Sequence, residues 1–164
     1  MKTKQLALCA LFVALMAVCA WLSVPIFDTP ITLQNFAVAL ALLVLGGKQG
    51  CIVIAVYLCM GTVGLPVFSG FRGGIGALLG PTGGYLWGFL AMGLTTCLVM
   101  RPLPGLILGL AVCYACGTAW YALAYADTQG LFWIMAKCVL PYLAPDAIKL
   151  WLAYSLSARL KTVL

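Results

Sequence analysis

Histidine and glutamate do not occur in this chain of 164 residues, and aspartate supplies its only three acidic side chains. The missing histidine excludes a Ser-His-Asp triad and any metal site with a histidine ligand. No pair of carboxylates lies close together in sequence either, which removes much of the usual catalytic set of residues. We therefore expect a protein that is not an enzyme and that holds neither a metal nor a cofactor.

Charge of either sign is scarce, because charged side chains make up 7% of the residues and hydrophobic ones 65%. A soluble domain carries about 25% charged residues, which is enough to cover a water-facing surface. The apolar runs here are continuous rather than alternating, as in membrane helices. The composition predicts an all-α integral membrane protein.

Proline and glycine divide the chain into apolar ranges of membrane-spanning character. We expect six transmembrane helices in one domain over residues 1–164: 6–24, 33–46, 51–65, 85–100, 106–125 and 145–160. Several are shorter than the usual ~20 residues, which is typical of helices that line a cavity. The first resembles a signal peptide but is long enough to span, so we expect it to be retained. The range 131–140 is too short to span and is expected near the surface.

Charged residues sort by side once six spans are counted. Both termini then share one side with a set of basic residues: Lys2, Lys4, Lys48, Arg101, Arg159 and Lys161. Asp28 and Asp127 fall on the other side. The positive-inside rule makes the first side cytoplasmic. The net charge of +6 is then mainly a topology signal, and no nucleic-acid partner is needed to explain it.

The last span opens with P-D-A-I-K, residues 145–149. Pro145 suits the first position of a helix, where Asp146 would meet the positive end of the helix dipole. Lys149 follows at i+3 on the same face. An ordinary salt bridge at a helix start is one interpretation. Since ionisable groups inside membranes are costly and usually face a cavity, a functional site is favoured.

Two further stretches are candidates for a ligand site on the outer side. Gln34 and Asn35 begin the second span, where they either cap the helix or hydrogen-bond a ligand. Residues 68–84 are rich in glycine, which permits positive φ and close backbone approach. They either pack tightly over helices or form a loop that covers a pocket; we favour the covering loop, between the third and fourth helices.

These motifs together resemble a known family. G-P-T-G-G-Y-L at 80–86, P-D-x-x-K at 145–149 and T-L-Q-N-F at 32–36 closely resemble BioY, the biotin-binding S component of energy-coupling factor (ECF) transporters. The resemblance covers essentially the whole chain. It implies biotin capture at the outer face of a bacterial cytoplasmic membrane, with a transmembrane T component and two ATPase subunits as partners.

The resemblance also implies site residues, and the chemistry of biotin suggests their roles. Matching positions are Asp146, Lys149, Gly83, Gly84, Tyr85 and Gln34, with Arg72 beside the glycine-rich loop. Our hypothesis is that Lys149, with Arg72, neutralises the biotin carboxylate and Asp146 accepts from a ureido N–H. The opposite polarity stays open. Tyr85 is a candidate wall for the bicyclic ring.

Small residues on the first helix form a candidate docking face for the T component. Ala7, Ala10, Ala14 and Ala17 are spaced i+3, i+4 and i+3 and share one side. Small-x-x-x-small faces let membrane helices approach closely. Internal packing is the alternative.

Three other functions compete with biotin capture. The chain could be an S component for another vitamin or a solitary facilitator, a structural subunit of a membrane complex, or a membrane-embedded enzyme. The enzyme would use Cys113 and Cys116 as its reactive pair. Cysteine in an apolar stretch is more often a packing residue, so we expect that role for both.

Overall fold

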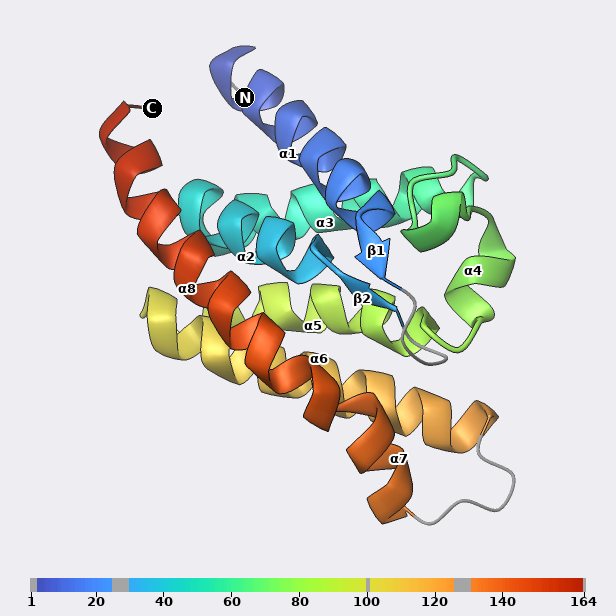
Figure 1. The fold of residues 1–164 in the computed structure, drawn as a ribbon. Helices are drawn as coiled ribbons and strands as arrows, with labels where there is room; N and C mark the ends of the chain where they lie inside the picture. Colours follow the sequence, from blue (N-terminus) through green and yellow to red (C-terminus); the bar gives the residue numbers. More distant parts are fainter. Residues whose placement is uncertain (1–2, 25–29, 100, 126–130, 164) are drawn as a thin grey trace.

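The computed structural model describes residues 3–24, 30–99, 101–125 and 131–163, which form a predominantly helical fold (Figure 1). The elements in order are α1 (Thr3–Trp21), β1 (Ser23–Val24), β2 (Ile31–Thr32), α2 (Gln34–Leu45), α3 (Gly47–Thr62), the 3₁₀ turn η1 (Ser69–Phe71), α4 (Ile75–Leu79), α5 (Gly83–Leu98), α6 (Pro102–Ala124), α7 (Leu131–Cys138) and α8 (Leu140–Val163). Lys2, Asp28 and Asp127, which entered the topology prediction, lie outside the described residues.

Helix α2 lies at the centre of the fold. Every residue from 37 to 43 is buried, so α2 is covered on all sides. Helices α1, α3 and α8 pack around it. A helix that is apolar all round is typical of such a central position.

Helices α5 and α6 form the most extensive helix pair of the structure. Helix α3 also packs on α5, which joins this pair to the α2 group. The beginning of α1 and the end of α8 lie at the same end of the molecule (Figure 1). The β-hairpin and α4 lie away from that end.

Each of the six predicted ranges overlaps one helix: α1, α2, α3, α5, α6 or α8. Among the described residues, two helices are long and apolar enough to cross a membrane on that basis alone, namely α1 and α6. Helices α2 and α3 are apolar but shorter. The predominantly helical class is confirmed.

The predicted start of the last helix is wrong. Helix α8 begins at Leu140, and Pro145 lies inside it. A proline at this position removes the hydrogen bond to the carbonyl four residues earlier, which belongs to Pro141 in the first turn. The helix therefore tolerates Pro145 near its beginning. Asp146 is in consequence not at a helix terminus, and the macrodipole does not account for its charge.

The region read as a glycine-rich loop contains η1 and α4. Gly70 and Gly74 have the positive φ angles expected of it, 69° and 85°. Gly83 and Gly84 instead belong to the first turn of α5. The antiparallel pairing of β1 with β2 was not predicted from sequence.

Candidate binding site

Asp146 and Lys149 form a buried ion pair on α8. Lys149 Nζ lies 2.6 Å from Asp146 Oδ1. Asp146 is 0% exposed and Lys149 is 6% exposed. The i,i+3 spacing brings the two side chains to one face of the helix, as the sequence predicted. Charges buried at this depth need further hydrogen bonds to offset their lost hydration.

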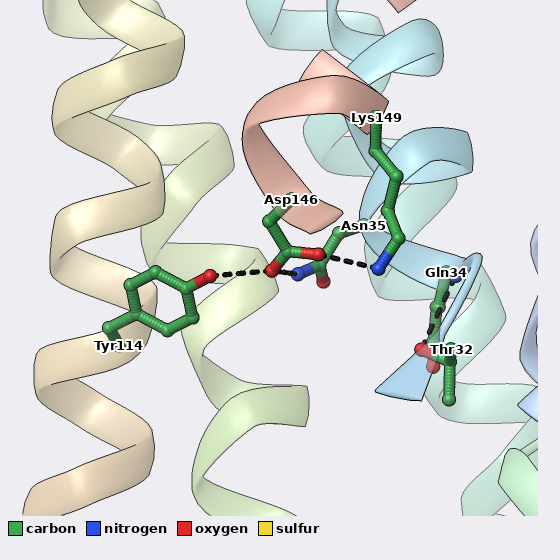
Figure 2. Close-up of polar contacts among 6 residues, drawn as sticks. All are labelled: Thr32, Gln34, Asn35, Tyr114, Asp146 and Lys149. Carbon is green, nitrogen blue, oxygen red and sulfur yellow. Dashed lines mark hydrogen bonds and ion pairs between the residues drawn. The ribbon is translucent and has the colours of Figure 1, made fainter. Parts of the chain in front are cut away.

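Two other helices supply those hydrogen bonds to Asp146. Tyr114 on α6 donates its hydroxyl to Oδ2 at 2.6 Å, and the Asn35 side-chain amide at the start of α2 donates to the same oxygen. Figure 2 shows Asp146 between Tyr114 on one side and Lys149 on the other. Three segments far apart in sequence therefore meet at one carboxylate.

Gln34 belongs to a neighbouring polar chain. Its Nε2 donates to Tyr57 Oη at 2.9 Å, and Tyr57 donates onward to the Val67 carbonyl at 2.8 Å. Thr32 Oγ1 accepts from the Gln34 backbone N–H at 3.3 Å. Neither Gln34 nor Asn35 caps α2, whose N-cap residue is Leu33, and their side chains instead have tertiary partners.

Two adjoining cavities open beside these groups. The smaller, about 50 Å³, is lined by Asp146, Lys149, Asn35 and three tyrosines, Tyr85, Tyr114 and Tyr142. The larger, about 570 Å³, is lined among others by Gln34, Arg72, Ser69 and Thr82. Pro30 and Thr32 line both. The larger volume lies within the range of about 300–1,000 Å³ that is usual for small-molecule sites.

The structure brings most of the predicted site residues to these cavities. Asp146, Lys149 and Tyr85 line the smaller one, and Gln34 and Arg72 line the larger. Tyr85 is anchored by its hydroxyl, which donates to the Cys138 carbonyl at 2.8 Å.

Gly83 and Gly84 line neither cavity. A Cβ at Gly83 would lie 1.8 Å from the Leu78 carbonyl oxygen, and one at Gly84 would lie 2.3 Å from Trp120 Cβ. Both glycines therefore allow α5 to approach α4 and α6 closely. Direct contact of either with a ligand stays a prediction.

Tyr114 and Tyr57 were missed by the sequence analysis. Each is a tyrosine in an apolar helix, and a buried tyrosine hydroxyl normally has a hydrogen-bond partner. The sequence therefore indicates that each hydroxyl has a hydrogen-bond partner, but it does not indicate which residue that partner is. Tyr114 also lies between Cys113 and Cys116, inside a Cys-x-x-C pattern.

The cysteines do not gather into a metal site within the described part of the chain, where no group of three potential metal ligands is found. Cys113 is buried and contacts the Tyr85 carbonyl through Sγ at 3.7 Å, and Cys116 is partly buried. Neither forms a disulfide.

Known proteins resemble this chain in sequence and in fold. A relative from Pyrococcus horikoshii, described as a probable biotin transporter BioY, is 42% identical over 167 residues and covers 98% of each chain. The Thermotoga maritima biotin transporter BioY is 37% identical over 146 residues, which are 89% of this chain and 79% of that protein. The crystal structure of the S-component for biotin from an ECF-type ABC transporter superposes with a TM-score of 0.90 at 26% identity, covering 98% of this chain and 92% of the other.

A family model described as the BioY family matches residues 1–164. The resemblance inferred from the three sequence motifs is thereby confirmed, and it extends beyond those motifs to the helical fold. With that match and relatives above 30% identity over most of both chains, the chain belongs to the BioY family.

Proposed function

We propose that this chain is the biotin-binding S component of an ECF transporter, which captures biotin at the outer face and passes it inward with a T component and two ATPase subunits. The names of its relatives support biotin as the substrate. The observation that carries the proposal is the buried Asp146–Lys149 pair at a small cavity, which adjoins a larger cavity of small-molecule size. The proposed activity is binding and transport rather than catalysis.

The hydrogen-bonding capacity left over at the ion pair suits a cyclic urea. An ionised carboxylate has about four acceptor positions, of which Lys149, Tyr114 and Asn35 take three. One position on Asp146 remains for a ureido N–H. The Lys149 ammonium has three donors and one assigned partner among the described residues, so it has donors available for the ureido carbonyl.

This arrangement supports the opposite role for Lys149 from the one first assigned to it. A lysine already paired with Asp146 at 2.6 Å is neutralised within the protein and has less to gain from a ligand carboxylate. Arg72 lines the larger cavity and is exposed. In our proposal Arg72 meets the biotin carboxylate, and Tyr85 stands beside the ring system.

The proposed setting is the bacterial cytoplasmic membrane, with α1, α2, α3, α5, α6 and α8 as its six spans in a single domain. The beginning of α1 and the end of α8 lie at one end of the molecule, which supports termini on one side (Figure 1). Lys4, Lys48 and Lys161 favour the cytoplasm for that side. The segment from η1 to α4 then lies at the outer face, over the cavity.

The test is equilibrium binding of labelled biotin to the purified chain in detergent. We expect the parent to bind and Asp146→Asn and Lys149→Met each to lose binding. Removing one member of a buried pair leaves an unpaired charge or donor and also costs stability, about 3–5 kcal/mol for a buried charge. The double variant Asp146→Asn/Lys149→Met is neutral and of similar shape, so it should keep its thermal unfolding midpoint and still not bind.

Two results would contradict the proposal. Parent-like binding by the folded double variant would place the site elsewhere. A folded parent that binds no biotin would reject biotin and leave an S component for another solute.

A further inference from the structure

The turn before Arg72 has an unusual backbone. Gly70 and Phe71 follow one another at φ 69° and 56°. Phe71 is the single residue other than glycine with a positive φ within the described ranges. Residues other than glycine rarely adopt a positive φ, and those that do persist where their surroundings impose the conformation. Burial of Phe71 is not the cause, since it is 64% exposed.

Trp21, the last residue of α1, holds this turn at two points. Its ring stacks on Phe71 with 4.9 Å between centroids and 24° between planes. Its indole Nε1 donates to the Pro66 carbonyl at 2.8 Å. A third contact closes the turn itself, because the Phe68 N–H donates to the Arg72 carbonyl at 3.0 Å.

The closed turn directs Arg72 to the larger cavity. Ser69, Gly70, Arg72 and Gly73 all line that cavity, whereas Phe71 does not. Because the chain reverses at Gly70 and Phe71, the Phe71 side chain packs on Trp21 and the next residue, Arg72, lines the cavity. Within the described residues, the guanidinium of Arg72 has no ion-pair or hydrogen-bond partner that would otherwise hold it.

We propose that Trp21 and Phe71 are positioning residues, which hold Arg72 at the cavity for the carboxylate of the bound ligand. This inference rests on the proposed function, because it takes the ligand to be a carboxylic acid. Neither aromatic residue lines either cavity. Their effect should therefore depend on the ligand's charge, unlike a general effect on folding.

The experiment compares biotin with its uncharged methyl ester. Dissociation constants for both are measured on the parent, Arg72→Ala, Trp21→Leu and Phe71→Gly. Glycine at position 71 adopts the same positive φ without strain, so this variant removes the stacked ring while allowing the backbone of the turn to stay as it is. Trp151→Leu, on the exposed side of α8, is the matched control for the loss of a tryptophan.

We expect the parent to prefer the acid by about tenfold or more, as charge-assisted pairing implies. Arg72→Ala should abolish the preference by weakening biotin alone. Trp21→Leu and Phe71→Gly should reduce the preference in the same way, with ester affinity unchanged, and Trp151→Leu should behave as the parent.

Four results would overturn the inference. Unchanged preference in both aromatic variants would show that Arg72 needs no support, and equal losses for both ligands would show a purely structural role. A parent that binds acid and ester equally would remove the role of Arg72 while biotin binding stands. A parent that binds neither would reject the proposed function and this inference together.

Discussion

At the scale of single residues, the site depends on one buried carboxylate with three donors. Asp146 accepts a hydrogen bond from Lys149 at Oδ1 and hydrogen bonds from both Tyr114 and Asn35 at Oδ2. Such bonds to a charged acceptor are worth about twice neutral ones. The network holds the carboxylate in place before a ligand arrives, since its donors come from three packed helices.

Tyr114→Phe tests this network. Removing the hydroxyl deletes one charge-assisted bond to a fully buried carboxylate, which should lower the free energy of unfolding by about 1.5–3 kcal/mol. Chemical unfolding in detergent measures it. Tyr154→Phe is the control, because Tyr154 lies on α8 but is 43% exposed, and it should change stability little. Equal stability of the two variants would contradict the assigned role of Tyr114.

At the scale of elements, glycine sets how closely α5 and α6 pack. A Cβ at Gly88 would lie 2.8 Å from Cys113 Sγ, and one at Gly117 would lie 2.4 Å from the Tyr85 ring. Inside a membrane the hydrophobic effect does not drive helices together, because lipid tails are as apolar as the side chains. Membrane helices therefore associate by such close packing. Gly88 and Gly117 thus let the two helices approach closely, and Gly117 leaves room for the Tyr85 ring at the cavity wall.

Gly84→Ala should destabilise the fold strongly. Its Cβ would lie 2.3 Å from Trp120 Cβ and 2.8 Å from the Cys116 carbonyl oxygen, so α5 and α6 would have to separate. Overpacking of this kind costs about 1–3 kcal/mol or more. Gly76→Ala in α4 is the matched control, since nothing lies within 4 Å of its Cβ position. Thermal unfolding should show a lower midpoint for Gly84→Ala only; parallel shifts would argue against helix packing as the cause.

At the scale of the whole molecule, the exposed side of α1 is the candidate contact with the T component. Ala7, Ala10 and Ala14 are exposed, whereas Ala17 is buried. Internal packing therefore explains Ala17 alone. The other three leave a shallow apolar face on which another membrane helix could lie closely.

Ala10→Trp/Ala14→Trp should abolish ATP-driven biotin uptake in cells that contain the energising module while leaving biotin binding intact, because the bulk blocks docking far from the cavity. Ala111→Trp/Ala115→Trp on α6 is the matched control, with exposed alanines at the same i,i+4 spacing. We expect it to transport normally. Equal loss of uptake in both double variants, or loss of binding in the first, would contradict docking through α1.

Much of the fold and part of the site were predictable from the sequence. The helical class, the approximate helix positions and the Asp146–Lys149 pairing follow from composition and local spacing. The start of α8 was wrong because two prolines, Pro141 and Pro145, both fit a first turn. Local rules could not choose between them, since packing of the preceding residues decides where a helix begins.

The sequence by itself therefore determined the membrane class, through its scarcity of charge, and the ion pair, through an i,i+3 spacing that any helix would realise. Only the tertiary structure decided that Tyr114 and Asn35 join Asp146, from 32 and 111 residues away in the chain. It likewise decided that Gly83 and Gly84 pack helices and that Trp21 reaches the turn beside Arg72. The physical reason is the same for each, because these contacts depend on how whole helices pack and no local pattern encodes their partners.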